Sequence, residues 1–304
     1  MSGKPKCIII LSTKSAGSSA LQELLCNFGG GRHVQQTRHG EFETLYWTKA
    51  ASILGLPQIK LPDSEVPIPR DRALQDLQAL LTQNTTGFEL PADDNRLIFD
   101  GWRALCLAHA PVFVEKSPHH LHQWSCLQLM IEAVQTQPEI DFRFVGLVRN
   151  PMDALYSAWS RWRLPPEAFQ QHWRTAYENL ERFRGQIGDQ LTVVRYEDFS
   201  STGSTGSRLL NTLEIQATRD GADDYIHGAY RGRWKVDRGF GFQPNDAVVE
   251  VAHRFGYPAH DLTNKRSLTW PLRRVVSQAT HRLISRPLAL ATRELRQHLY
   301  RTPN

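Results

Sequence analysis

The feature that most constrains the fold is an apolar run followed by a small polar loop and an amphipathic segment. Residues 7–11 read Cys-Ile-Ile-Ile-Leu, a continuously apolar stretch typical of a buried parallel strand. Residues 12–17 predict a loop. From Ser18 to Phe28 the apolar residues recur at helical spacing, and three glycines then end the helix. Strand, tight loop and helix form the unit from which parallel α/β sheets are built.

The same alternation continues along the chain. Further buried strands are expected at residues 112–115, 142–148 and 191–195. Helices are expected at residues 42–55, 71–81, 95–109 and 121–134, from about 152, and at 167–184. This pattern predicts a three-layer α/β fold, a mostly parallel sheet flanked by helices, in one domain over residues 1–264. The Ser/Thr/Gly-rich residues 200–207 are expected to form a flexible loop within it.

The loop between the first strand and the first helix predicts an anion-binding site. Backbone N–H groups at a helix start have no intrahelical partners, and they add to a helix dipole that favours negative charge. Gly17 lets the backbone approach an anion closely, while Lys14 supplies a mobile positive charge. The lysine precedes the glycine, so the loop is not a Walker A motif, and a nucleoside-triphosphate kinase is disfavoured. The alternative, for the loop taken alone, is a plain strand–loop–helix turn with serine capping.

The order strand, Lys-Ser-x-Gly-Ser-Ser, helix resembles the 5′-phosphosulfate loop of sulfotransferases that use 3′-phosphoadenosine 5′-phosphosulfate (PAPS). The resemblance implies a fold similar to that of P-loop nucleoside triphosphate hydrolases. It assigns to donor binding the residues Lys14, Ser15, Ala16, Gly17, Ser18 and Ser19. Ala16 departs from the usual family pattern, a small change that is expected to leave the backbone cradle intact.

A second segment, residues 142–161, strengthens the resemblance. Arg149-Asn-Pro-Met-Asp at a strand end, with Ser157 about two turns later, resembles the family's 3′-phosphate motif. This resemblance implies that Arg149 and Ser157 bind the 3′-phosphate of the donor. The alternative is a helix capped by Asn150, with proline at its first position and Arg149 paired to an acid.

Three later segments also resemble the family. They are Glu115-Lys-Ser-Pro118, Val194-Arg-Tyr-Glu-Asp-Phe199 and the basic residues 228–242. In the last of these, Arg231, Arg233 or Lys235 is expected to reach a phosphate. Lys116 is expected to touch acceptor or sulfate, and its alternative is an ion pair with Glu115 or a neighbour.

Sulfuryl transfer needs positive charge at the leaving group and a base at the acceptor. Lys14 is expected to stabilise the leaving group. Related glycan and bacterial sulfotransferases use a glutamate in the region after the first helix as base, which makes Glu43 the first choice and Glu41 the second. His119 and His120 are the rivals, because another branch of the family uses histidine. The alternative for each of these residues is a solvated loop position.

The net charge of +5 is concentrated at the end of the sequence. Residues 265–304 hold nine Lys/Arg and one acid, Glu294. Because the charge is local rather than spread over a face, no nucleic-acid partner is expected. This amphipathic tail is interpreted as a terminal helix packed on the domain, and the alternative is peripheral contact with an anionic membrane.

The remaining expectations concern compartment, cofactors and function. The four cysteines lack metal or disulfide spacing, and no secretory signal or membrane span is recognised, which predicts a metal-free cytoplasmic protein. The resemblance implies sulfuryl transfer from PAPS to a hydroxyl or amine of a small-molecule, glycan or lipid acceptor. The alternatives are a P-loop kinase-like phosphotransferase and a non-catalytic nucleotide-binding module.

Overall fold

The computed structural model describes residues 3–61, 64–199, 204–226, 231–265, 269–280 and 283–284. Its strands are β1 (Lys6–Ser12), β2 (Val112–Lys116), β3 (Asp141–Val148) and β4 (Leu191–Arg195). Its helices are α1 (Ser18–Gly29), α2 (Tyr46–Ile53), α3 (Arg70–Asn84), α4 (Asp94–Ala108), α5 (Trp124–Thr136), α6 (Pro151–Trp162), α7 (Pro166–Ile187), α8 (Tyr196–Phe199), α9 (Thr205–Thr212), α10 (Asp246–Arg254) and α11 (Trp270–Thr280). Short 3₁₀ helices are η1 (Gly40–Phe42), η2 (His120–His122), η3 (Gly188–Gln190), η4 (Ala222–Asp224), η5 (Arg233–Lys235) and η6 (Ala259–Asp261).

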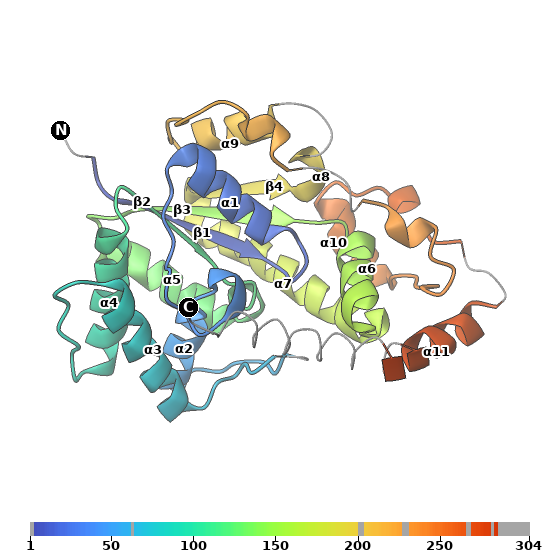
Figure 1. Ribbon diagram of the computed structural model, residues 1–304, viewed down its shortest axis with the longest axis horizontal. Helices are drawn as coiled ribbons and strands as arrows, with labels where there is room; N and C mark the ends of the chain where they lie inside the picture. Colours follow the sequence, from blue (N-terminus) through green and yellow to red (C-terminus); the bar gives the residue numbers. More distant parts are fainter. Residues whose placement is uncertain are drawn as a thin grey trace, which may run out of the picture. The chain divides into compact units, whose positions relative to one another are not determined.

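The four strands form one parallel sheet in the order β2-β1-β3-β4 (Figure 1). The register pairs Ile10 with Lys116 and Ser12 with Leu147, so the carboxyl ends of the strands meet at one edge. After β1 the chain builds β2 on one side, and it then returns to build β3 on the other. The order therefore reverses between β1 and β3, which is the point at which open α/β sheets bind ligands.

Alternate residues of the strands bury opposite faces of the sheet. Ile8 and Ile10 belong to an apolar cluster with the leucines of α1 and α9. On the other face, the Phe113 ring lies 5.5 Å from Trp102 of α4, and the Phe144 ring lies 4.9 Å from Phe183 of α7. Helices thus cover both faces, and the predicted three-layer α/β fold is confirmed.

Two predicted segments differ from the structure. The helix expected at 42–55 is shorter, because residues 43–45 are not helical and Leu45 has a left-handed φ of 48°. The loop expected at 200–207 is wrong over 205–207, where α9 has already begun. Its leucines, Leu209 and Leu210, bury against the sheet-facing core, and this packing outweighs the local Ser/Thr/Gly composition. Residues 200–203 lie outside the described residues.

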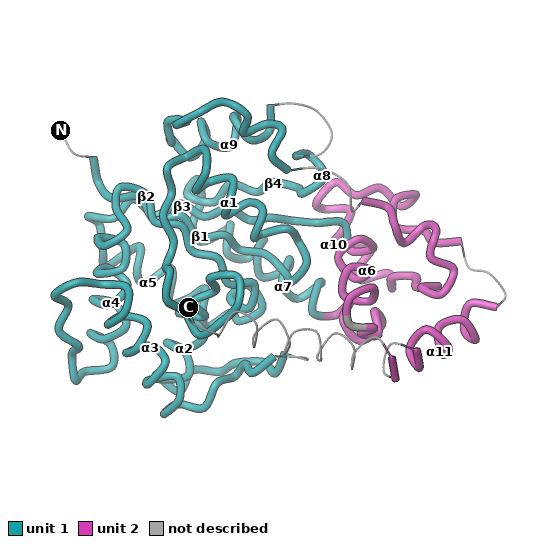
Figure 2. Tube along the Cα trace, viewed as in Figure 1, with its two compact units in different colours: residues 1–150, 172–229 teal, residues 151–171, 230–304 magenta. Residues whose placement is uncertain are grey.

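The chain divides into two compact units (Figure 2). Unit 1 comprises residues 1–150 and 172–229 and contains the sheet. Unit 2 comprises residues 151–171 and 230–304, where the Phe240 ring packs 5.1 Å from Tyr156 and 6.4 Å from Trp159. The predicted boundary after residue 264 falls within unit 2 and stays a prediction.

Within unit 2, α11 forms most of the described part of the basic tail. A Cβ built on Gly241 would lie 2.4 Å from the Trp270 ring, so the start of α11 packs tightly. Farther along, Leu272, Val275 and Val276 are exposed rather than packed. No helix in the described ranges is long and apolar enough to cross a membrane. Most of the tail beyond residue 280 lies outside the described residues.

Candidate functional site

The loop of residues 12–17, here called the donor loop after the role that the resemblance implies, joins β1 to α1 at the carboxyl edge of the sheet. The Ala16 N–H donates to the Thr13 carbonyl at 3.2 Å, and Ser15 and Gly17 both adopt left-handed φ angles, 65° and 97°. A Cβ on Gly17 would lie 2.5 Å from the ring of Tyr196, so the backbone conformation and the packing both require glycine. Gly17 is also the N-cap of α1 and has no side chain with which to cap the helix.

These features fit a bound anion. The first N–H groups of α1 are the ones that a helix leaves without internal partners. Among the described residues, the shielded hydroxyls of Ser12 and Ser15 find no hydrogen-bond partner. Buried hydroxyls of this kind are normally satisfied, so they are suited to donate to a ligand oxygen. Lys14 is half-buried, and its charge helps to lower the pKa of His119.

Arg149 follows β3 and reaches the donor loop. Its Nη1 donates to the Ser15 carbonyl at 2.7 Å, and its guanidinium lies 4.6 Å from the centre of the Tyr196 ring. The next residue, Asn150, donates its N–H to Glu197 Oε1 at 3.0 Å. The arginine of the second motif and the loop of the first therefore meet between β1 and β3, where the strand order reverses.

Tyr196 is a site residue that the sequence analysis did not assign. Its ring packs against Gly17 on one side and contacts Arg149, and the side chain is buried. The signal was present in the sequence, because the tyrosine follows β4 directly, at the same edge of the sheet as the two motifs. Gly17 and Tyr196 lie far apart in the sequence, so their contact could not be predicted from the spacing of motifs.

Lys116 connects the end of β2 to the segment that carries the candidate bases. Its side chain is fully buried, and Nζ donates to Ser19 Oγ at 3.2 Å and to the Glu41 carbonyl at 3.0 Å. The same nitrogen lies 3.5 Å from both Glu43 Oε1 and Glu41 Oε2. The ion-pair alternative for Lys116 is thus realised with Glu41 and Glu43, which brings three sequence-predicted residues together beside the donor loop.

Glu43 and Glu41 occupy different environments. The Glu43 side chain is 17% exposed, with Oε1 3.5 Å from Lys116 Nζ and Oε2 3.6 Å from His119 Nδ1. Burial raises the pKa of Glu43 above its ordinary value, against the opposing charge of Lys116. Glu41 is 65% exposed and accepts a hydrogen bond from Ser19 Oγ. The pKa of Glu43 is therefore nearer neutrality than that of an ordinary glutamate, as suits a general base.

The two candidate histidines are both buried. Burial, with the nearby charge of Lys14, lowers the pKa of His119 to about 2. A nitrogen with so low a pKa holds a proton poorly at neutral pH. His120 is fully buried, and its Nε2 already accepts the backbone N–H of Trp47 at 3.2 Å.

The other predicted donor residues lie in unit 2. Ser157 is on α6. Arg231 lies just before η5 and Arg233 is its first residue, and both side chains are exposed. The Gly232 N–H donates to Asp153 Oδ1 at 2.7 Å, which ties this basic turn to α6. The structure thus brings these residues together within unit 2, and their assignment to phosphates stays a prediction. Residues 227–230 of the same loop lie outside the described residues.

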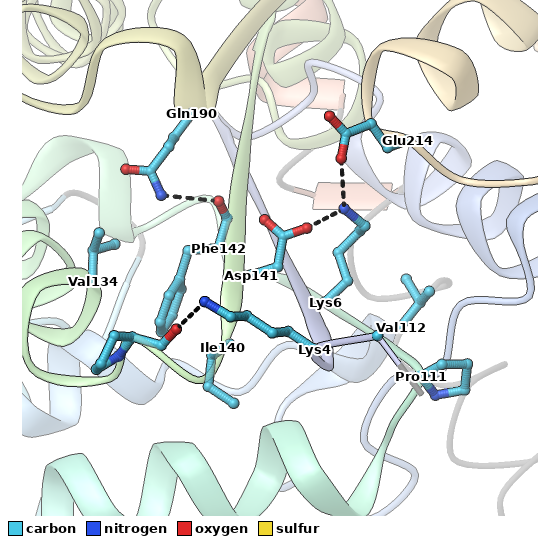
Figure 3. A pocket seen from close by; sticks show the side chains of 12 residues that line it. Lys4, Lys6, Pro111, Val112, Val134, Ile140, Asp141, Phe142, Gln190 and Glu214 are labelled. Carbon is cyan, nitrogen blue, oxygen red and sulfur yellow. Dashed lines mark hydrogen bonds and ion pairs between the residues drawn. The ribbon is translucent and has the colours of Figure 1, made fainter. Parts of the chain in front are cut away.

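A hollow of about 870 Å³ lies at the opposite edge of the sheet (Figure 3). It is lined by the first residues of the strands, including Lys6 and Asp141, which form an ion pair there. None of the predicted site residues lines it, and ligands of parallel sheets bind at the carboxyl ends. Within the described ranges, no group of three His, Cys, Asp or Glu side chains is arranged to hold a metal ion.

Comparison with known proteins identifies the family. The model of the sulfotransferase family matches residues 5–219, which hold the donor loop, the Lys116 group, Arg149 and Tyr196. The chain belongs to the sulfotransferase family. This membership supports sulfuryl transfer as its activity. No curated protein matches the chain significantly.

A solved structure supports the fold of this sulfotransferase family member. The chain is similar to a sulfotransferase domain from the curacin biosynthetic pathway, with 16% identity and a TM-score of 0.54, over 84% of this chain and 99% of that one. It also matches a sulfotransferase domain from the Synechococcus PCC 7002 olefin synthase at 14% identity and a TM-score of 0.49, over 85% of this chain and 97% of that one. At the identity of the first match the likeness establishes the fold, which is the P-loop-like fold of sulfotransferases.

Proposed function

We propose that the protein transfers a sulfuryl group from PAPS to a hydroxyl or amine of an acceptor. The observation that carries the proposal is the hydrogen bond from Arg149 to the Ser15 carbonyl. It sets the arginine of the 3′-phosphate motif beside the loop of the 5′-phosphosulfate motif, and PAPS is a nucleotide with phosphate-type groups at both positions. The unpartnered hydroxyls in the described donor loop and the open start of α1 support the same ligand.

The residues divide the chemistry as follows. Glu43 takes the proton of the acceptor O–H or N–H while that atom forms a bond to sulfur. The bond from sulfur to the 5′-phosphate oxygen breaks, and negative charge develops on adenosine 3′,5′-bisphosphate. Lys14, Lys116 and the N–H groups of the donor loop stabilise that charge and hold the 5′ end in line. A metal has no part in this scheme.

Two other functions make different predictions. A P-loop kinase-like phosphotransferase would bind nucleoside triphosphate with Mg²⁺, and a non-catalytic module would bind nucleotide without turnover. The arrangement of Glu43 between Lys116 and His119 favours an enzyme over a binding module, because a half-buried carboxylate with a raised pKa is typical of a general base. Glycan, lipid and small-molecule acceptors all remain in the proposal, as does membrane contact through the tail.

Calorimetric titration with adenosine 3′,5′-bisphosphate tests the donor. We expect tight binding that is unchanged by EDTA, because the proposed ligands are amides, hydroxyls and cations of the chain. ATP with Mg²⁺ is the competing ligand, and stronger binding of ATP would support the kinase-like alternative. Absence of bisphosphate binding would overturn the proposal. A screen with radiolabelled PAPS over glycans, lipids, phenols and peptides then identifies the acceptor.

The pH dependence of transfer is expected to report on Glu43. A base works only when deprotonated, so kcat/KM should fall as the pH falls through the Glu43 pKa. Because burial raises this pKa, the acid limb should lie at higher pH than for an ordinary glutamate. The nearby Glu41 charge also raises it, so Glu41→Gln should move the limb to lower pH. The acid limb is not due to Glu43 if Glu41→Gln leaves it at the same pH and Glu43→Gln still shows it.

A further inference from the structure

We infer that Glu115 is a positioning residue: through Ser117, Thr44 and His120 it fixes the start of α2 and thereby holds Glu43 in place. The inference rests on the proposed role of Glu43 as base. Glu115 stands one residue before Lys116 at the end of β2 and is almost completely buried. A buried carboxylate is costly unless several donors satisfy it, so its partners indicate its purpose.

Three side chains converge on the Glu115 carboxylate. Oε1 accepts hydrogen bonds from Ser117 Oγ at 2.6 Å and Thr44 Oγ1 at 2.7 Å, while Oε2 lies 3.5 Å from His120 Nδ1. Although burial opposes ionisation, His120 and the two hydroxyls lower the pKa of Glu115 below its ordinary value. With one oxygen taken by two hydroxyls and the other facing a buried imidazole, Glu115 is an anchor and not itself a proton acceptor for substrate.

Each partner of Glu115 also accepts one backbone N–H at the start of α2. Ser117 Oγ accepts from Leu45 at 3.0 Å, Thr44 Oγ1 from Tyr46 at 3.0 Å, and His120 Nε2 from Trp47 at 3.2 Å. Each hydroxyl accepts from the backbone and donates to Glu115, while His120 Nε2 accepts from the backbone and its Nδ1 faces Glu115 Oε2. These N–H groups are the ones that a helix start cannot satisfy internally, and the helix dipole favours a carboxylate there.

Glu43 is held because the two residues after it and its own carbonyl are fixed. Thr44, the next residue, is bound to Glu115, and Leu45 adopts a left-handed conformation whose N–H is fixed by Ser117. The Glu43 carbonyl accepts from Thr37 Oγ1 at 2.6 Å. With its backbone fixed in this way, the Glu43 carboxylate is kept within 3.6 Å of both Lys116 and His119.

The sharpest test is Ser117→Ala, which removes one link and leaves every charge in place. We expect kcat for sulfuryl transfer from radiolabelled PAPS to fall about 10- to 100-fold, since small displacements of a catalytic group have effects of this size. The donor KM and the affinity for adenosine 3′,5′-bisphosphate should change little. Hydrogen exchange should accelerate at the amides of Leu45–Trp47. Ser117→Thr keeps the hydroxyl and should restore kcat.

Two further variants separate positioning from general damage. Ser125→Ala is the matched control, because Ser125 is also buried and its hydroxyl donates to the Pro57 carbonyl, outside the network. Glu115→Gln should lower kcat and move the acid limb to lower pH, because the Glu115 charge is among the groups that raise the pKa of Glu43. An equal loss of kcat in Ser125→Ala, or faster exchange at Leu45–Trp47 with unchanged kcat in Ser117→Ala, would overturn the positioning role.

Different results would contradict the role of Glu43 as base and the positioning role of Glu115. Full turnover in Glu43→Gln would overturn Glu43 as base and this inference with it. Full turnover in Ser117→Ala and Glu115→Gln, with turnover lost in Glu43→Gln, would overturn only the inference. The exchange measurement reports on the network itself and needs no turnover.

Discussion

Glu43→Gln is expected to abolish most sulfuryl transfer while leaving nucleotide affinity intact. The amide has nearly the same shape as the carboxylate but accepts no proton, and a general base contributes roughly 10²- to 10⁴-fold to rate. We therefore expect kcat to fall by about that factor in transfer from radiolabelled PAPS. The affinity for adenosine 3′,5′-bisphosphate, measured by calorimetry, should stay within about twofold of the parent, because Glu43 faces Lys116 and His119.

The controls for this prediction are the rival bases. Glu41→Gln changes an exposed carboxylate and should retain most of kcat. His119→Asn removes a group whose pKa is lowered to about 2, and it should keep the acid limb of the pH profile that Glu43→Gln loses. If His119→Asn abolishes turnover and Glu43→Gln does not, histidine is the base and our assignment is wrong.

Arg149→Ala is expected to lower the affinity for adenosine 3′,5′-bisphosphate by roughly 10- to 100-fold, the range for losing a hydrogen bond to a charged group. The sharper expectation is a loss of discrimination. Adenosine 5′-monophosphate lacks the 3′-phosphate, so its affinity should change far less. Calorimetry with both nucleotides measures the difference, and in the variant the two affinities should converge.

The matched control is Arg143→Ala, on the strand that Arg149 follows. Arg143 pairs with Asp141 and Glu214 at the amino end of the sheet, away from the donor loop. Each substitution removes one guanidinium. Arg143 lies within β3 and Arg149 directly after it, and of the two only Arg149 contacts Ser15. Equal losses of both nucleotides in Arg149→Ala would assign this residue to the shape of the loop and not to the 3′-phosphate.

The sequence predicts the strands well, and it places the two motifs at strand ends, because both signals are local. A continuous apolar run identifies β1, and its register with β3 brings the ends of both motifs to one edge of a parallel sheet. The choice between Glu41 and Glu43 is not local. It depends on burial beside Lys116, which stands more than seventy positions later in the chain.

The same limit applies to Tyr196 and to Glu115. Nothing near Gly17 in the sequence indicates that an aromatic ring closes over it, and nothing near Glu115 indicates that its partners serve the start of α2. In α9 the reverse holds, since a Ser/Thr/Gly-rich composition predicts a loop and tertiary burial of Leu209 and Leu210 overrides it. Each of these features arises from contacts between segments that are distant in sequence.

The Tyr196 ring has a consequence for how substitutions in the site combine. One ring contacts both Gly17 and Arg149, so the two halves of the proposed nucleotide site share a wall. Neighbours that share a partner do not contribute additively to free energy. A double-mutant cycle through position 196 should therefore show coupling between the ends of the nucleotide. A redesign of either half of this site for a different donor therefore has to vary Tyr196, Gly17 and Arg149 together.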